Sequence, residues 1–392
     1  MRPKFLKLCQ FIGNHEQMLF IILIAFMATW GWGTLYEINH VKPYFFQQTL
    51  YLGIAIAAFM LIQLLDLKRL AKSYWIWPPL AVIANVIYSN FGLNRTMLTE
   101  LYRFNVIAGI VTGMTCLIYF AGLLTKGSRN LTAAIFKEEI VKSHWYQITQ
   151  KIALAAYIIF LAGIYATGIF VVWFVPLIIS CMIILFAIKK YGTGALTAGV
   201  SLAFFVSAMN AEPWRIYRFL VARLASESIH KLHSGGIIGS WAVPAASTQW
   251  WQFANGDFVF ATVGQIHGLL GITCLLLVFL IFGYFGLRAA VRSDNRFSAL
   301  LVLSMTALIL TGVLLSSLSG CGMIGGLGHI SIPFFTYGGG DLLLGAIGAG
   351  LIFKQLRSKP DANPFPINVS RWLLIMAGLA LLIVVKTAVI MV

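Results

Sequence analysis

Two carboxylates stand where an irregular segment is expected to enter an apolar helix. The 392 residues hold only 12 Asp and Glu side chains. Asp257 ends a long polar connection, and Asp341 follows three consecutive glycines. The helix dipole favours an ionised carboxylate at a helix N-terminus, where it could accept a proton as a general base. Asp is also a preferred N-cap residue, so helix capping is the alternative interpretation for both positions.

Basic residues that could hold a phosphate gather in the connection 210–256. Arg215 and Arg218 lie in the stretch WRIYRFLVARLASESIHKL, whose spacing of apolar residues suits an amphipathic helix lying in the membrane interface. Arginine binds phosphate in a bidentate way, so these residues could form a cationic cradle for a lipid-linked substrate. A surface helix whose arginines reach toward water is the alternative.

A second charged group precedes the predicted helix 104–124. Glu100 and Arg103 are three residues apart and can pair, and Arg95 lies just before them. An ionisable pair near membrane depth is a candidate functional site. Structural pairing on one helix face explains the same spacing equally well.

The segment IPFFTYGGGD, residues 332–341, joins an apolar run to another helix through a bare backbone turn. Three glycines free the backbone for positive φ or for close approach to another group. In a membrane protein, irregular backbone is tolerated only where protein or a water-filled cavity surrounds it. We therefore expect a cavity bordered by Pro333, Tyr337, Gly338, Gly339 and Asp341.

Membrane-spanning helices must position these residues. The chain is 60% hydrophobic and only 10% charged, unlike a soluble domain of this size. Apolar runs of about 20 residues predict transmembrane helices. We expect an all-α polytopic membrane protein that forms one integral membrane domain over residues 1–392, with the division between 151 and 190 left open. The predicted helices cover about residues 18–36, 45–65, 74–92, 104–124, 151–169, 171–188, 193–209, 258–286, 297–316, 341–356 and 372–391.

The distribution of Lys and Arg predicts the orientation. Most of the 28 basic residues fall on one side if the N-terminus is cytoplasmic, as the positive-inside rule requires. Residues 210–256 then form one large extracytoplasmic loop. The net charge of +16 is explained by topology and does not indicate nucleic acid. We expect no cleavable signal peptide.

The second half of this loop, HSGGIIGSWAVPAASTQWWQFANGDF, has two interpretations. Gly235 and Gly236 favour irregular backbone, and the tryptophans suit the headgroup layer. The segment could be an aromatic belt or a re-entrant lip over a cavity.

Several other chemistries find no support. The chain contains no GxxxxGK[ST] loop, no CxxC pair and no HExxH helix. The spacing of its histidines is no metal signature, and we identify no cofactor, although a divalent cation requirement stays open. Of the five cysteines, only Cys321 is expected near the outer face, so no outer disulfide is expected.

Several segments are similar, in order, to motifs of one known family. IPFFTYGGGDLLLGAIGAGLI is similar to its LPFISYGGSS signature, and NGDFVFATVGQIHGLLGI to its TDFIFAVIGEELGLIG segment. HSGGIIGS resembles the glycine-rich stretch before the latter, QQTLYLGIAIAAFMLIQLLDLKRL a helix ending in D-Y-R-R-L, and MLTELYR the QPSELAK motif. From about residue 18 to 356, the chain therefore resembles the SEDS family (shape, elongation, division and sporulation; RodA/FtsW/SpoVE).

This resemblance implies a fold of ten transmembrane helices, to which residues 371–392 would add another. It implies a glycosyltransferase that polymerises lipid II, the undecaprenyl-pyrophosphate-linked disaccharide-peptide, at the outer face of the bacterial cytoplasmic membrane. The role would be in cell division, elongation or sporulation. The implied partner is a class B penicillin-binding protein, a monofunctional transpeptidase.

Residue roles follow from the same resemblance. The essential acid of the TDF motif falls on Asp257, which would deprotonate the 4-hydroxyl of the acceptor sugar. Arg95, Arg215 or Arg218 could stabilise the charge on the leaving undecaprenyl pyrophosphate, an assignment that rests on their predicted side of the membrane and not on a motif. The remaining residues expected at the substrate are Glu100, Arg103, Gly235 and Gly236.

The chain departs from the family pattern at several positions. Gln265 and Ile266 replace a pair of glutamates, and Gly340 and Asp341 replace two serines. A Pro-Asp motif expected near residues 163–170 is absent. Three functions therefore stay open: a glycosyltransferase, a catalytically impaired scaffold for a transpeptidase, and a lipid-carrier flippase.

Overall fold

A computed structural model describes the chain over residues 2–38, 42–77, 171–187, 222–240, 258–324, 332–358 and 367–391, together with a few positions between 114 and 199. Regular structure in these residues is helical. The elements are α1 (Arg2–Ile38), α2 (Lys42–Leu64), α3 (Leu67–Lys72), η1 (Tyr74–Ile76), α9 (Val171–Ala187), α12 (Ala222–Gly235), α14 (Val259–Arg292), α15 (Arg296–Gly320), α16 (Gly339–Arg357) and α17 (Val369–Met391).

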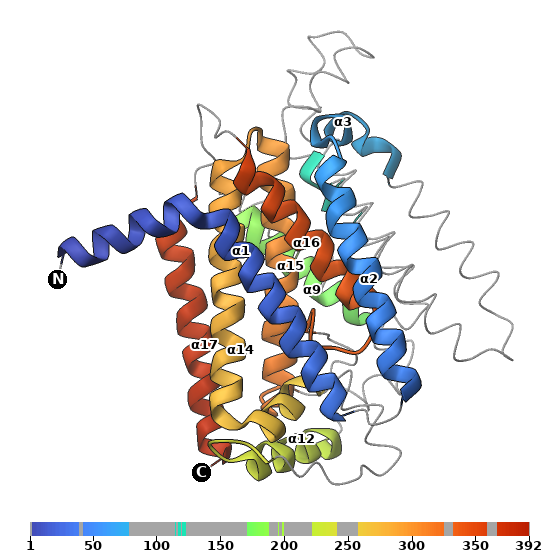
Figure 1. Ribbon diagram of the computed structural model, residues 1–392, viewed down its shortest axis with the longest axis vertical. Helices are drawn as coiled ribbons and strands as arrows, with labels where there is room; N and C mark the ends of the chain where they lie inside the picture. Colours follow the sequence, from blue (N-terminus) through green and yellow to red (C-terminus); the bar gives the residue numbers. More distant parts are fainter. Residues whose placement is uncertain are drawn as a thin grey trace, which may run out of the picture.

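The long helices form a bundle, with α12 lying across one of its ends (Figure 1). α14 is central, because it contacts α1, α12, α15, α16 and α17. α16 runs along α2, and α17 lies beside α14 with its C-terminus at α12 (Figure 1). The chain is therefore an all-helical, multi-pass membrane protein.

Helices α1, α2, α14, α15 and α17 are long and apolar enough to cross a membrane. All five contain runs that the sequence predicts as spans. The sequence also predicts α16 as a span, but α16 is not one of these five, because glycines, Asp341 and Lys354 dilute its apolar side chains. The predicted helices around 74–92, 104–124, 151–169 and 193–209 lie largely outside the described residues, so their number stays a prediction.

Aromatic side chains join α1 to α14. The ring of Phe20 packs against Phe282 at 6.0 Å and edge-on against Phe285 at 5.3 Å between centroids. These side chains are almost fully buried. Aromatic pairs at such distances add about 0.5–1.5 kcal/mol each beyond the burial of their area. This packing fixes α1 along the face of α14.

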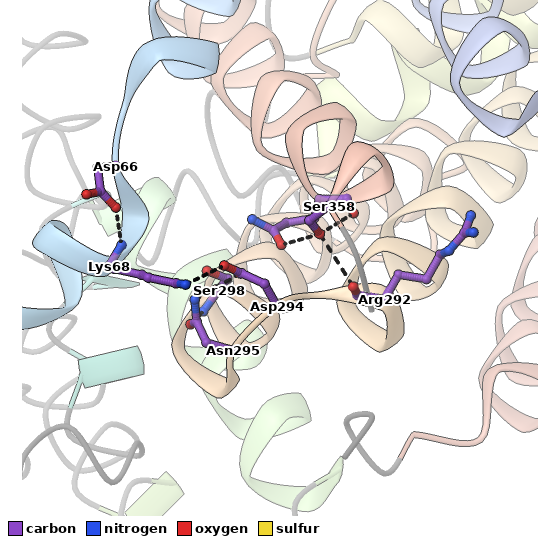
Figure 2. Close-up of polar contacts among 8 residues, drawn as sticks. Asp66, Lys68, Arg292, Asp294, Asn295, Ser298 and Ser358 are labelled. Carbon is purple, nitrogen blue, oxygen red and sulfur yellow. Dashed lines mark hydrogen bonds and ion pairs between the residues drawn. The ribbon is translucent and has the colours of Figure 1, made fainter. Parts of the chain in front are cut away.

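Charged and polar groups gather at one end of the bundle, which we call the basic end. Figure 2 shows its contacts among Asp66, Lys68, Arg292, Asp294, Asn295, Ser298 and Ser358. Asp66 caps α3 by accepting a hydrogen bond from the Lys68 amide at 2.9 Å, and the Lys68 ammonium lies 3.7 Å from Asp294. Asn295 caps α15 through the amide of Ser298 at 2.8 Å. These contacts tie α3 to the α14–α15 connection.

Glu16 belongs to the same end. Its carboxylate is buried and pairs with Arg288, at 2.9 Å from Nε, and with Arg292. α1 has a non-helical residue at His15, and the part before it bends away from the bundle (Figure 1). With the N-terminus in the cytoplasm, the predicted spans put Glu16, Asp66 and Asp294 on the cytoplasmic side. The structure places all three at one end of the bundle.

Candidate functional site

The glycine-turn segment, residues 332–338, folds back on itself. The Ile332 carbonyl accepts hydrogen bonds from the amides of Phe335 and Thr336 at 3.1 and 3.0 Å, and the Ile332 amide donates to the Thr336 hydroxyl at 2.8 Å. Phe334 has a φ of 73°, an uncommon value for a residue with a side chain. Its carbonyl lies so close to Gly31 of α1 that a Cβ at Gly31 would overlap it. The turn therefore depends on Gly31, which is far from it in the sequence but lies against it in the fold.

Helix α2 holds the far side of this turn. The Tyr337 hydroxyl donates to Gln47 Oε1 at 2.7 Å, and the Gly338 amide donates to Gln48 Oε1 at 3.3 Å. A Cβ at Gly339 would lie 2.8 Å from the Tyr51 ring. Pro333 is buried, whereas Tyr337, Gly338 and Gly339 are half-buried. The irregular backbone is thus enclosed by protein, as a membrane protein requires.

Asp341 lies in the first turn of α16 and is 8% exposed. The interpretation of Asp341 as the N-cap is wrong, because the helix begins at Gly339 and its N-cap is Gly338. Asp341 is three residues beyond the cap, where an acid still interacts favourably with the helix dipole.

The second glycine-rich segment, residues 235–240, lies directly on α14. α14 has a kink at Gly268, whose φ is 66°. A Cβ at Gly235 would overlap the Gly264 carbonyl, and one at Gly239 would lie 2.6 Å from the carbonyl carbon of Ile266. Gly239 and Gly236 both have positive φ, 100° and 54°. Backbone therefore packs against backbone, with no room for a side chain at the contact.

Hydrogen bonds complete this contact, which we call the loop–kink junction (residues 235–240 with 264–270). The Ser240 amide donates to the Gln265 carbonyl at 2.8 Å. The amides of Leu269 and Leu270 donate to the carbonyls of Gly236 at 3.0 Å and Ile237 at 3.2 Å. A kink removes the regular i to i−4 partners of a helix, and buried backbone groups need replacements. The loop supplies them.

Helix α1 joins the two segments. The Trp30 indole packs edge-on against Phe335 at 5.0 Å and against His267 at 5.8 Å between centroids. The Trp30 indole N–H donates to His267 Nε2, with 3.4 Å between the two nitrogens, and the Thr34 hydroxyl oxygen lies 3.2 Å from the same His267 nitrogen. The glycine turn and the loop–kink junction therefore both contact Trp30.

Gln265 and Ile266, the residues in place of a glutamate pair, are both buried at the junction. Gln265 Oε1 has no hydrogen-bond partner among the described residues. A neutral amide replaces a carboxylate here, so this part of the junction supplies no acid for proton transfer.

The structure describes only some of the predicted site residues, and their roles stay predictions. Gly235 and Gly236 belong to the loop–kink junction, and Pro333, Tyr337, Gly338, Gly339 and Asp341 to the glycine turn or the helix after it. The others lie outside the described residues: Arg95, Glu100, Arg103, Arg215, Arg218 and Asp257. α14 begins two residues after Asp257, at Val259.

Sequence reasoning missed Trp30, Thr34, Gln47 and Gln48. A pair of glutamines in an apolar predicted helix was an available signal, since buried amides need partners. Among the described residues, no three His, Cys, Asp or Glu side chains gather as metal ligands do, and a cation requirement stays a prediction.

Known proteins match this chain over a region that contains the glycine turn and the loop–kink junction. The family described as "Cell cycle protein" (FtsW/RodA/SpoVE) matches residues 14–360. A "Probable peptidoglycan glycosyltransferase FtsW" of Borreliella burgdorferi is 24% identical over 328 residues, covering 79% of this chain and 85% of its own. The protein with the same description from Synechocystis is 28% identical over 143 residues, 36% of each chain. "Peptidoglycan glycosyltransferase RodA" of Mycobacterium leprae is 28% identical over 158 residues, 37% of this chain and 32% of its own.

Two solved structures share the fold at low identity. A chain of the structure described as "Structural coordination of polymerization and crosslinking by a peptidoglycan synthase complex" has a TM-score of 0.63 and 16% identity, over 87% of this chain and 97% of its own. Rod shape determining protein RodA of Thermus thermophilus has a TM-score of 0.55 and 14% identity, over 87% of this chain and 96% of its own. With a family match over most of its length and a shared fold, this chain belongs to the SEDS family of membrane proteins, the FtsW/RodA/SpoVE family.

Proposed function

We propose that this protein is a peptidoglycan glycosyltransferase that polymerises lipid II at the outer face of the bacterial cytoplasmic membrane. The observation that carries the proposal is the meeting of the glycine turn and the loop–kink junction around Trp30. These are the two segments most similar to family motifs, and they lie about 70 residues apart in the sequence. Family membership and the descriptions of the relatives support the same activity.

The proposed reaction transfers a glycosyl group. The 4-hydroxyl oxygen of the acceptor sugar attacks the anomeric carbon of the donor, and the bond from that carbon to the pyrophosphate oxygen breaks. Asp257 takes the hydroxyl proton, and undecaprenyl pyrophosphate leaves with the electron pair. Arg95, Arg215 and Arg218 are the proposed partners of the pyrophosphate, with Glu100 and Arg103 nearby.

The proposed topology has a cytoplasmic N-terminus and ten family helices, followed by α17. The basic end, with Glu16, Asp66 and Asp294, then faces the cytoplasm. The loop–kink junction faces outward, where lipid II presents its sugar. We propose a class B penicillin-binding protein as partner, consistent with the description of one similar structure as a synthase complex.

One observation favours a second function, a non-catalytic scaffold. Gln265 and Ile266 put neutral, buried side chains where the family pattern has two acids. An enzyme that needed those acids would be impaired. Such a protein could still bind a transpeptidase through its intact bundle.

Polymerisation of lipid II by reconstituted protein separates these functions. Purified wild type and Asp257→Ala are given lipid II with and without the cognate transpeptidase, and products are resolved by gel. Polymer from the wild type alone supports the enzyme. No polymer from folded wild type with its partner present contradicts it and supports the scaffold. Lipid movement between leaflets without polymer supports a flippase.

A further inference from the structure

An apolar cavity of about 310 Å³ lies between α9, α14, α15 and α17. An engineered cavity of about half this volume, lined by similar side chains, is large enough to bind benzene. The volume is therefore ample for an apolar ligand. We call this cavity the α17 slot.

The α17 slot is long and runs parallel to the helices. Its lining extends from Leu276 to Leu287 on α14 and from Trp372 to Ile383 on α17. At a rise of about 1.5 Å per residue, each stretch is about 16 Å long. One leaflet contributes about half of the roughly 30 Å hydrocarbon core of a bilayer. The slot thus has the length that a lipid chain occupies in one leaflet.

The lining offers almost nothing to a polar ligand. The polar side chains among the described lining residues are Thr306, Thr311 and Trp372. The Thr306 hydroxyl already donates to the Val302 carbonyl of its own helix at 2.8 Å. A bound water needs two to four polar partners, so the slot suits hydrocarbon better than water.

Packing of α17 explains why the slot exists. The C-terminal part of α17 is anchored: Thr387 Oγ1 lies 3.1 Å from Cys321 Sγ, and the Ile390 carbonyl lies 3.0 Å from His233 Nδ1. Its buried residues are Ile383, Thr387 and Met391. The stretch before Ile383 lacks such full burial and leaves the slot between itself and α14.

The surroundings of the slot are membrane. Outward-facing residues of α17, including Leu374, Leu382 and Val385, are exposed in an apolar candidate span. Arg371, exposed, directly precedes Trp372 at one end of the slot. A cation at that level is placed to accompany a phosphate headgroup. The slot therefore adjoins both the hydrocarbon and the headgroup of a lipid.

We propose that the α17 slot binds one hydrocarbon chain of a phosphate-bearing membrane lipid. α17 lies beyond residues 14–360, the part that matches the family, so one wall of this site comes from outside the matched region. The bound hydrocarbon chain could belong to a phospholipid or to a polyprenyl phosphate. Both lipids combine an apolar tail with a phosphate, which is the chemistry that the slot recognises. The inference requires only that the bundle spans a membrane and is independent of the glycosyl transfer proposed above.

Photocrosslinking tests the proposal. Full-length protein in nanodiscs receives either a phospholipid with a diazirine in its acyl chain or a polyprenyl phosphate with a diazirine in its tail. Crosslinked residues are then mapped by mass spectrometry. We expect at least one probe to label residues 372–383 on the side facing α14, and the probe that labels identifies the source. Labelling confined to outward residues such as Leu374 and Leu382 would overturn the proposal.

Matched variants sharpen the test. Ala380→Trp fills the slot, and Leu381→Trp adds the same side chain on the exposed face next to it. Slot crosslinks should fall at least tenfold in Ala380→Trp and stay within twofold in Leu381→Trp. Ala307→Leu fills the slot from α15 and leaves the sequence of α17 unchanged. It should lower the slot crosslinks as Ala380→Trp does, which separates filling of the slot from a disturbance of α17. Undiminished labelling in both filling variants, with Cys321 still protected from thiol reagents, would contradict a site in the slot.

Discussion

Gly31 in α1 packs directly against the backbone of Phe334 in the glycine turn, with no space between them for a Cβ on Gly31. A Cβ there would lie 2.8 Å from the Phe334 carbonyl carbon and 3.2 Å from Phe335 Cα. Phe334 has positive φ, so the turn has little freedom to move away. A single glycine thus sets how closely α1 approaches one of the two family motifs.

Gly31→Ala should destabilise the protein by about 1–3 kcal/mol, because overpacking against backbone cannot relax by a rotamer change. Gly33→Ala is the matched control, since a Cβ at Gly33 meets nothing within 4 Å. Alanine is favoured over glycine in a helix by up to about 1 kcal/mol, so the control should be neutral or stabilising. Thermal unfolding of the two purified variants measures the difference. Equal melting temperatures would refute the close contact.

Gly239→Ala should open the loop–kink junction and lower polymerisation at least tenfold. Its Cβ would meet the carbonyl carbons of Ile266 and His267 at 2.6 and 2.8 Å. Gly236→Ala also places alanine at positive φ but into open space, so it carries backbone strain without the collision. Hydrogen exchange at the Leu269 and Leu270 amides reports the junction directly. Protection of these amides that survives Gly239→Ala would argue against the account.

Thr34→Val should weaken the link between α1 and His267. The Thr34 hydroxyl is buried, donates to the Trp30 carbonyl at 3.0 Å and lies 3.2 Å from His267 Nε2. Loss of one buried hydrogen bond costs about 1 kcal/mol. Thr29→Val, an exposed site whose hydroxyl bonds only within α1, should change stability by less than about 0.5 kcal/mol. Denaturation curves of the two variants measure their losses of stability. A larger loss for Thr29→Val than for Thr34→Val would contradict this prediction.

Cys321 should react slowly with maleimide at neutral pH. Burial raises the pKa of its thiol to about 11, although the Thr387 hydrogen bond and the Lys386 charge lower it. Only the thiolate is nucleophilic, so labelling should rise about tenfold per pH unit until the pH nears the pKa. Labelling of a protein with Cys321 as its single cysteine gives the profile. Met323→Cys in a cysteine-free protein is the control, because Met323 is 43% exposed and should label quickly.

Fast labelling of folded Cys321 near pH 7, at the rate of the unfolded chain, would contradict its burial under α17. The described cysteines Cys181, Cys274 and Cys321 are all free.

Most helices in the described residues could be predicted from the sequence. The apolar runs 297–316 and 372–391 fall inside α15 and α17, since a span must bury about 20 apolar residues whatever its neighbours are. The kink at Gly268 could not be predicted in this way. Glycine inside an apolar run is compatible with a straight helix, and the bend depends on hydrogen bonds that the Leu269 and Leu270 amides donate to the carbonyls of Gly236 and Ile237.

The candidate site was predictable only in its glycine segments. Their local composition signals irregular backbone, but not which helices enclose it. The contacts of Tyr337 with Gln47 and of Trp30 with His267 join residues more than 200 positions apart. The N-cap at Gly338 was missed because the N-cap preference favours Asp over glycine. The turn requires a φ of 152° at the cap position, which glycine adopts readily.

The most direct test of the central claim is the initial rate of lipid II polymerisation by wild type, Asp257→Asn and Asp294→Asn, each with its transpeptidase. Asn keeps the shape of Asp but cannot accept the proton. Asp294 forms an ion pair with the exposed Lys68 at the basic end and accepts a hydrogen bond from the Asn295 side chain, so Asp294→Asn controls for charge removal. We predict a fall of at least about 100-fold for Asp257→Asn, within the range that general-base catalysis contributes, and little change for Asp294→Asn. Equal rates for wild type and folded Asp257→Asn would contradict the account.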